Sequence, residues 1–542
     1  MDLQPNNDLP NNQRFQSKTL TTGNLTDSFQ KLNVSDIDSD KLEPNVCRIF
    51  SHSESSLENE NSNFSNVVGG DFFDMLGTPL HTNLFDKSDV YNVNNIIKGT
   101  NAECDRRRDA WILSDKARRG LIAAATAIPG TFFPDRELLT MPGVALEEDM
   151  VDSVTQVVTH YLGEAEANQR KVLTVRDVTQ DERGLRDLIQ AECFRAAVNL
   201  TGHLLTIYGQ GVGRIGHPSK HTVHSIQLWF TRLSLLVKLK EFSLLETEGS
   251  VWWDCDRPDL YYQFYPELYG GRLGTLIPFQ MRLLLAMLPS YCDKHQESLE
   301  RLYSILATVR KILNNLNNDR SEDGSQLEIS PQDRAESKLL WKNREKRVQH
   351  AIANVALQQK DYGLAVVILE NLALEETNAV YKRTLKSALG RIFLQFGDIL
   401  NAERSFSLAH QLKQTQMGTL NADTVDFRDI VDKGLMAVAQ NSFQEAYDCF
   451  YKASLLEPSN IMVMNNIATC HLYQGRLKEA IRVLSDAVNS NPSAALNENL
   501  VLNLCTLFEL ESSHSNNKKL ALLKLVSKYK GDAFDTSCLK LL

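Results

Sequence analysis

The sequence has no run of apolar residues long enough to cross a membrane. A spanning helix needs about 18 or more such residues, and Arg282 interrupts the best candidate, Leu276–Leu288. The N-terminus carries Asp2 and no apolar core region, so we predict no secretory signal peptide. We therefore expect a cytoplasmic protein without direct membrane insertion, whose contact with membranes comes through partners.

Cysteine is scarce and scattered. The chain has nine cysteines, an odd number, and no two of them form a Cys-x-x-Cys pair. This pattern is typical of buried thiols in a reducing compartment, and it argues against a disulfide framework or a zinc site.

Catalytic motifs are also missing. No Walker A motif, GxSxG elbow or HExxH motif occurs. Gly211–Gly216 matches the dinucleotide pattern GxGxxG, which works only between a strand and a helix. Here a predicted helix, Ala197–Tyr208, precedes it, and Pro218 biases His217 away from helix. We interpret the segment as an interhelical loop and predict no enzyme activity, no cofactor and no metal.

Two clusters that resemble functional sites have plainer interpretations. His217, His221 and His224 have the spacing of metal ligands but no fourth ligand at a useful interval, so we predict solvated loop histidines. Arg106–Arg108 has the composition of a basic signal, but acidic residues flank it on both sides. We predict a solvated helix start there.

Negative charge is concentrated in the first hundred residues. They hold 14 acidic and 7 basic residues, whereas the whole chain has a net charge of −10. With 15 Asn, 11 Ser and no Trp, this segment cannot bury enough apolar area to fold, so we predict a disordered tail. The island Asp71–Gly77 fits either a short docking motif or an incidental apolar cluster, and we favour the second. The nearly neutral remainder gives no electrostatic reason to bind nucleic acid.

What the sequence does contain is a helical repeat near its C-terminus. Two adjacent copies are offset by the 34 residues typical of tetratricopeptide units. Two earlier copies are more loosely spaced, and Gly397, Asn441 and Gly475 stand where each hairpin would turn. The positions predicted to pack the repeats are Ala365, Ala402, Phe406, Ala446, Phe450, Ala453, Pro458, Ala480, Leu484, Ala487 and Pro492.

The residue types at these positions have a physical reason. Small residues let two helices cross closely, large apolar residues fill the groove against the next unit, and proline ends a helix. Phe242 falls where Phe443 sits, which predicts a degenerate repeat further upstream. We predict an all-α, tetratricopeptide-type α-solenoid behind a disordered N-terminal tail, a scaffold that holds other proteins.

The chain is predicted to divide into five parts. They are an acidic Asn/Ser-rich tail at 1–105, a helical, degenerate repeat-like region at 106–313, a polar linker at 314–335, tetratricopeptide repeats at 336–510 and a C-terminal capping helix at 511–542.

Three segments of the middle region are more distinctive than the repeat. They are Asp109–Trp111 with Gly130–Pro134 and Leu139–Gly143, then Ala196–Thr206, and then Leu228–Leu233 with Pro258–Tyr262. With them, the chain from about Arg106 to its end resembles the twelfth-subunit family of the TRAPP (trafficking protein particle) vesicle-tethering complex, which are tetratricopeptide repeat proteins.

The resemblance implies a peripheral, non-catalytic scaffold subunit that acts in endoplasmic reticulum to Golgi transport, Golgi organisation and autophagy. It implies the eighth, eleventh and thirteenth TRAPP subunits as partners, an indirect link to a Rab GTPase through the complex, and a place at the ER-Golgi intermediate compartment and Golgi. It supplies no catalytic residues.

Two alternatives remain open. A cytosolic tetratricopeptide chaperone or adaptor would hold a partner's C-terminus in a basic clamp. Lys386, Lys433 and Arg383 are available, but no repeated Lys/Arg–Asn arrangement occurs, so we rank this alternative second. An enzyme with appended repeats would need a catalytic domain in 106–313, where no motif supports one.

Overall fold

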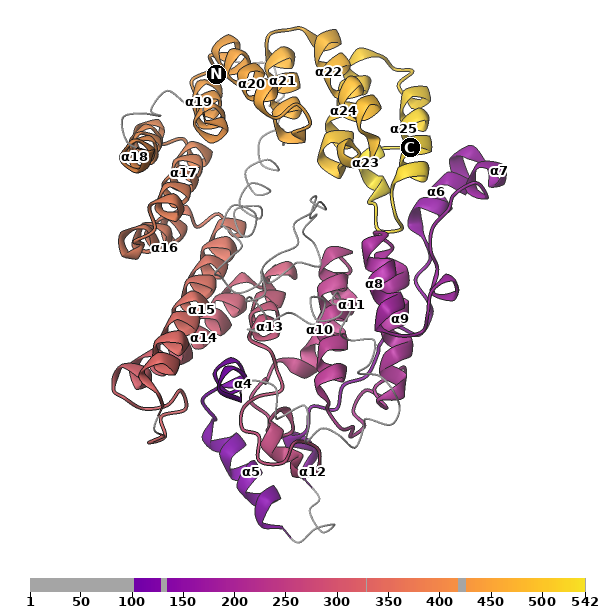
Figure 1. Ribbon diagram of the computed structural model, residues 1–542. Helices are drawn as coiled ribbons and strands as arrows, with labels where there is room; N and C mark the ends of the chain where they lie inside the picture. The colour runs from indigo at the N-terminus through magenta and orange to yellow at the C-terminus, as the bar shows by residue number, and fades with distance from the viewer. Residues whose placement is uncertain (1–101, 128–133, 328, 418–425, 542) are drawn as a thin grey trace, which may run out of the picture.

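Helices joined by loops make up the part of the protein that the computed structural model describes, residues 102–127, 134–327, 329–417 and 426–541 (Figure 1). In these ranges β-structure is limited to two isolated bridges, Val144 with Val212 and Tyr261 with Thr275. The all-α prediction is confirmed. The predicted tail as far as residue 101, with the island Asp71–Gly77, lies outside the described residues.

The helices before residue 318 vary in length. They are α4 (Ala102–Asp109), α5 (Asp115–Thr126), α6 (Ser153–Leu162), α7 (Glu164–Ala167), α8 (Glu182–Gln190), α9 (Phe194–Ile207), α10 (Val223–Lys238), α11 (Phe242–Gly249), α12 (Pro266–Tyr269), α13 (Phe279–Tyr291) and α14 (His295–Asn317).

The later helices form a more regular series. They are α15 (Pro331–Gln358), α16 (Tyr362–Glu375), α17 (Ala379–Phe396), α18 (Ile399–Met417), α19 (Phe427–Ala439), α20 (Phe443–Leu456), α21 (Ile461–Tyr473), α22 (Leu477–Ser490), α23 (Pro492–Ala495), α24 (Glu498–Glu511) and α25 (Asn516–Tyr529). Residues 314–317 thus belong to α14 and residues 331–335 to α15.

The same tight turn closes seven helical hairpins. In each, one residue with left-handed backbone follows the first helix: Glu192, Lys240, Asp293, Lys360, Gly397, Asn441 and Gly475. The next N–H then bonds back to a carbonyl five residues earlier, as from Arg476 to His471 at 2.9 Å and from Glu241 to Leu236 at 3.1 Å. This is the Schellman arrangement, which satisfies carbonyls left free at a helix end. The predicted turn positions Gly397, Asn441 and Gly475 are confirmed.

Successive hairpins also meet through a repeated aromatic contact. The first residue of one hairpin's second helix packs against the end of the next hairpin's first helix. The stacked pairs are Phe242 with Tyr291, Tyr362 with Phe396, and Phe443 with Tyr473, with ring centroids 5.9, 5.6 and 4.6 Å apart. The predicted equivalence of Phe242 and Phe443 is therefore confirmed, and hairpins on both sides of residue 318 stack in a similar way.

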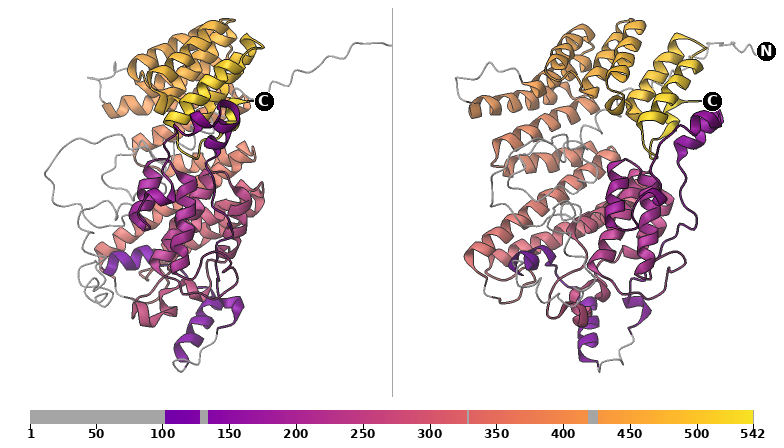
Figure 2. Two further views of the ribbon diagram at one scale, coloured as in Figure 1. Left: turned by 90° about the vertical axis from the view of Figure 1, so that its right-hand side faces the viewer. Right: turned by 45° about the vertical axis from the view of Figure 1, so that its right-hand side comes forward.

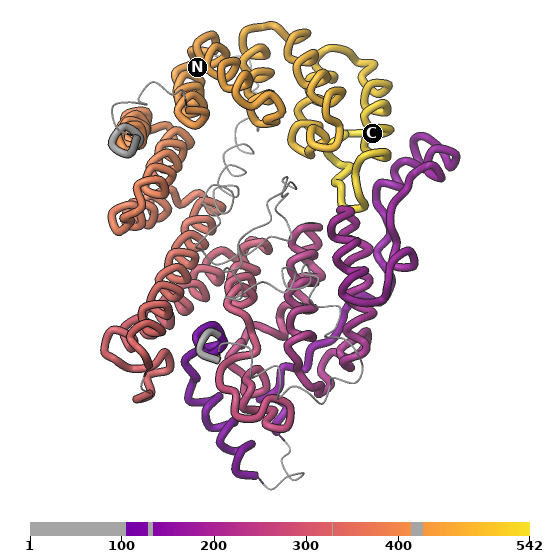
Figure 3. Tube along the Cα trace, in the orientation of Figure 1, coloured from indigo at the N-terminus to yellow at the C-terminus, as the bar shows by residue number. Residues whose placement is uncertain are grey.

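The hairpin series curves until its two ends meet (Figures 1 and 3). Helix α6 lies beside α25 and the short 3₁₀ helix η8 (Thr536–Leu539), and both side views agree (Figure 2). Val154 and Val158 of α6 are fully buried in one apolar cluster with Leu523 and Val526 of α25. The described chain is therefore a closed ring of helices.

Polar contacts complete this ring closure. The buried carboxylate of Asp532 accepts hydrogen bonds from the N–H groups of Arg195 and Ala196, at 3.0 and 2.9 Å, at the start of α9. The guanidinium of Arg170 donates to three carbonyls of the C-terminal segment, including those of Ser527 at 2.7 Å and Gly531 at 2.9 Å. These contacts satisfy free N–H groups at the start of α9 and free carbonyl groups at the end of α25.

A second junction ties the last turn of α4 to α15, and the prediction of a solvated helix start at Arg106–Arg108 is wrong in part, since only Arg108 is exposed. Arg107 is 3% exposed and pairs with Asp333 at 3.3 Å and Glu336 at 2.7 Å. Arg106 pairs with Glu322, a buried residue that also accepts a hydrogen bond from Ser337 at 2.6 Å. The flanking acids Asp105 and Asp109 pair with the exposed Arg108, whereas the acids that pair with Arg106 and Arg107 lie more than 200 residues away.

The ring closure should depend on pH through Asp532. Burial raises the pKa of this carboxyl to about 6, against the opposing effect of the N–H groups of Ala196 and Arg195. The folded-state pKa of Asp532 exceeds the ordinary value near 4. The contribution of this carboxyl to the free energy of unfolding is therefore largest below pH 4 and is lost as the pH rises through 6. We expect the free energy of unfolding of the wild type, relative to Asp532→Asn, to fall by about 1–3 kcal/mol between pH 4 and pH 7. Chemical denaturation at several pH values measures this difference, and a flat difference would contradict the assignment.

Candidate interaction surfaces

The residues predicted to pack the repeats lie mainly in the contact between the two helices of each hairpin. Ala365, Ala402, Ala446 and Ala480 are all fully buried on the second helices. Ala453, Phe450 and Leu484 are buried as well, whereas Phe406 and Ala487 are half-buried. Pro458 is exposed two positions after α20, and Pro492 is the first residue of α23. The structure thus distributes them along the series and does not gather them into one site.

Glycines on the first helices face large side chains on the second. A Cβ added at Gly390 would lie 2.4 Å from the ring of Phe406, and one at Gly434 would lie 2.7 Å from the ring of Phe450. Each glycine precedes its aromatic partner by 16 residues in the sequence, as Ala468 precedes Leu484 in the same apolar cluster. Close approach at these points sets the spacing between the two helices.

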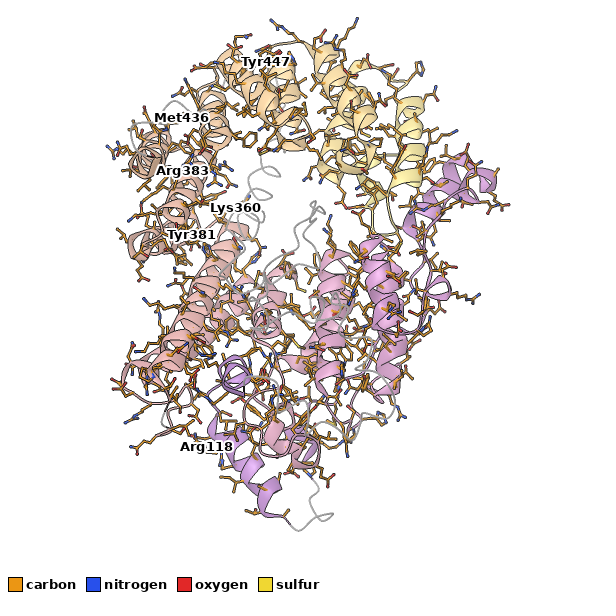
Figure 4. All side chains as sticks on the ribbon, viewed as in Figure 1. Arg118, Lys360, Tyr381, Arg383, Met436 and Tyr447 are labelled. Carbon is orange, nitrogen blue, oxygen red and sulfur yellow. The ribbon has the colours of Figure 1, made fainter. Side chains whose placement is uncertain are left out.

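Ion pairs join the first helices of neighbouring hairpins. Arg383 of α17 pairs with Asp426 at 2.8 Å and with Asp429 of α19 at 2.7 Å; Figure 4 labels Arg383, with Met436 on the neighbouring α19. Further along α17, Arg391 pairs with Asp432 at 2.9 Å. Burial raises the pKa of Asp432, although Arg391 opposes this effect.

These pairs bear on the clamp alternative. A basic clamp needs cations that are free to meet a partner's carboxylate. Arg383 is engaged by two acids of its own chain, Lys386 is half-buried, and Lys433 is exposed. The three cations therefore do not form a shared, unpaired cluster.

A small cavity lies between α21, α22 and α24. Its volume is about 20 Å³, which is room for about one water molecule. Asn465 and Asn503 line it, and the Nδ2 of Asn503 donates to the Oδ1 of Asn465 at 2.7 Å. A larger opening of about 290 Å³ is lined by Leu113, Arg118 and the loop Asp323–Ser325.

The histidine prediction is wrong in part. His221 is fully buried, with its Nε2 3.3 Å from the carboxylate of Asp259 and its Nδ1 3.4 Å from Gln210. Gln210 also accepts a hydrogen bond from the indole of Trp229 at 2.8 Å. His221 thus belongs to a buried polar network that holds the loop before α10. Within the described ranges, no three His, Cys, Asp or Glu residues are placed to hold a metal ion.

The GxGxxG segment is a loop between α9 and α10, as predicted. The element before it is a helix, and Gly213 and Gly216 have left-handed backbone with φ of 71° and 78°.

The described helices include none that is both long enough and apolar enough to span a membrane.

The chain has close sequence relatives. It is 41% identical over 440 residues to trafficking protein particle complex subunit 12 of Mus musculus, and the match covers 81% of this chain and 54% of that protein. The same subunit of Homo sapiens is also 41% identical over 440 residues, and that match covers 81% of this chain and 59% of that protein. The chain therefore spans little more than half the length of these relatives.

The solved structures that match this chain are less similar to it than these sequence relatives. The crystal structure of yeast Tom70 is 12% identical, covers 83% of this chain and 80% of that chain, and has a TM-score of 0.26. No protein-family model matches the chain.

Three glycine substitutions test the hairpin packing. We expect Gly390→Ala and Gly434→Ala each to lower the free energy of unfolding by about 1–3 kcal/mol, because the new methyl group meets an aromatic ring. Gly363→Ala is the matched control, since a Cβ there meets only the Oδ1 of Asp361, at 3.6 Å. It should raise stability by about 0.5–1 kcal/mol through helix propensity. Urea unfolding measures all three, and stabilisation by all three would show that the rings do not set the helix spacing.

Proposed function

The chain is a relative of trafficking protein particle complex subunit 12 over 81% of its length, and we propose that it is a non-catalytic scaffold subunit of a TRAPP vesicle-tethering complex. The sequence identity to two mammalian subunits is the observation that carries this proposal. The proposed setting is endoplasmic reticulum to Golgi transport and autophagy, at the cytoplasmic face of the ER-Golgi intermediate compartment and the Golgi.

The ring of hairpins supports a role in holding other proteins. Stacked helical repeats present large, shaped surfaces and keep them rigid through contacts between neighbours. Here the closure through Asp532 and Arg170 also fixes the two ends of the series relative to each other. A rigid, closed framework is suited to orienting several partners at once.

The proposed partners are other TRAPP subunits, namely the eighth, eleventh and thirteenth, with an indirect link to a Rab GTPase through the assembled complex. The absence of catalytic motifs from the sequence supports a part in assembly and not in the exchange reaction itself. The family resemblance supports the choice of partners.

Affinity purification of the tagged full chain with quantitative mass spectrometry tests this function. We expect the eighth, eleventh and thirteenth TRAPP subunits to be recovered in similar amounts and to co-elute with the chain in one large species on gel filtration. Depletion should slow the exit of cargo from the endoplasmic reticulum and fragment the Golgi, and the purified chain alone should not stimulate nucleotide exchange on a Rab GTPase.

The contradicting result is a chain that elutes at its own size and recovers no TRAPP subunit. The variant Gly390→Ala, which leaves the surface unchanged, controls for losses caused by reduced stability alone.

A further inference from the structure

Helix α16 is apolar on nearly every side. Its sequence, YGLAVVILENLALE, contains no lysine, arginine or histidine, and apolar residues occupy most of its positions. A helix of this kind is normally buried all round, in a core or in an interface. The surroundings of α16 are therefore informative.

Only part of α16 is covered by its own chain. Ala365, Leu369, Leu372 and Ala373 are buried in the cluster shared with α15, α17 and α18. Leu364 and Ile368 are partly buried beside that cluster and the one formed by α14 and α15. The helix lies at the outer side of the ring, at the left margin of Figure 1.

One stripe of α16 is left exposed along the helix, and we call it the α16 stripe. Each member lies three or four residues from another member, which places them on one face. Val367 is 56% exposed and Leu374 is 73% exposed. The α16 stripe consists of Gly363, Val367, Glu370, Asn371 and Leu374.

The second helices α18 and α20 also expose large apolar residues, among them Leu400 and Leu455, but at the position of Val367 the other repeats differ from α16. Val367 stands two positions after the buried Ala365. The residues two positions after Ala402, Ala446 and Ala480 are Arg404, Asp448 and Arg482, and all three are charged and exposed. The fold therefore accepts a charge at this position, so packing inside the chain does not require valine there.

Gly363 points to close approach from outside. Its φ is not in the left-handed region, and a Cβ there would make only one ordinary contact, with Asp361. The fold itself thus does not need glycine at this position, whereas a second helix crossing α16 would gain from the missing side chain.

Charge identifies the occupant. Glu370 and Glu375 are exposed beside the apolar residues, and α16 offers no cation to balance them. A second copy that docked through the same stripe would place acid against acid, which is unfavourable. A helix that presents apolar residues bordered by lysine or arginine would match both the exposed apolar side chains of α16 and its negative charge.

We propose that the α16 stripe is the docking surface for another TRAPP subunit, which contributes an apolar helix bordered by basic residues. This inference rests on the proposed function and assigns it to one face of one helix. The docking surface lies on the outside of the ring.

Paired substitutions in the full chain test the proposal. Val367→Asp with Leu374→Asp should reduce the recovery of TRAPP subunits at least ten-fold, while the melting temperature stays within a degree or two, because both side chains are exposed. Glu370→Lys with Glu375→Lys should reduce recovery several-fold and weaken its dependence on salt. The matched control is Tyr451→Asp with Leu455→Asp on α20, at positions 50% and 64% exposed, and it should keep full recovery.

Each other result would overturn the proposal. If the folded α16 variant recovers as many TRAPP subunits as the wild type, the docking surface lies elsewhere and the proposed function stands. If the α16 and α20 variants lose recovery equally, the stripe has no special role. If the wild type instead dimerises through α16 in sedimentation analysis, the occupant is a second copy. A wild-type chain that recovers no TRAPP subunit would contradict the proposed function and this inference together.

Discussion

Close contact between the two helices of each hairpin is the constraint on which the rest of the structure depends. Gly390 and Gly434 leave space that the rings of Phe406 and Phe450 fill, so that the helix spacing is set by side chains that cannot compress. With this spacing and a Schellman turn repeated at seven hairpins, each hairpin presents the same edge to the next. The curvature that follows brings α6 to α25, where Asp532 and Arg170 join residues more than 300 positions apart.

In the closed ring, the surfaces that pack against the rest of the chain are distinct from the surface that we propose for a partner. The first helices α17 and α19 are joined by Arg383 and by the buried Asp432, so their polar groups act within the chain. The second helix α16 exposes Val367 and Leu374 of the α16 stripe, which no described element covers. A scaffold needs both properties, because a partner gains most from an exposed apolar face that is held rigid by everything behind it.

The sequence was informative where the repeat obeys local rules. Ala446 and Ala480 occur in strict register, and Gly397, Asn441 and Gly475 are residues that favour left-handed backbone. Glu192, Lys240 and Asp293 make the same turn without that signal, at a cost of about 1–2 kcal/mol each, so the earlier hairpins were harder to recognise. The ring closure and the burial of Arg107 and His221 depend on partners distant in sequence, which no local pattern reveals. The sequence does contain a signal for the α16 stripe, because Val367 occupies a position that is charged in the other three repeats.

The central claim is that the chain assembles with TRAPP subunits through the outer face of its helical ring. Cross-linking mass spectrometry of the purified native complex, with a lysine-reactive reagent, tests it most directly. Lys360 is exposed at the turn that leads into α16 (Figure 4), and Lys452 is exposed on α20. The account predicts cross-links from Lys360 to one other TRAPP subunit in preference to those from Lys452. Cross-links to TRAPP subunits that come from Lys452 and never from Lys360 would contradict it.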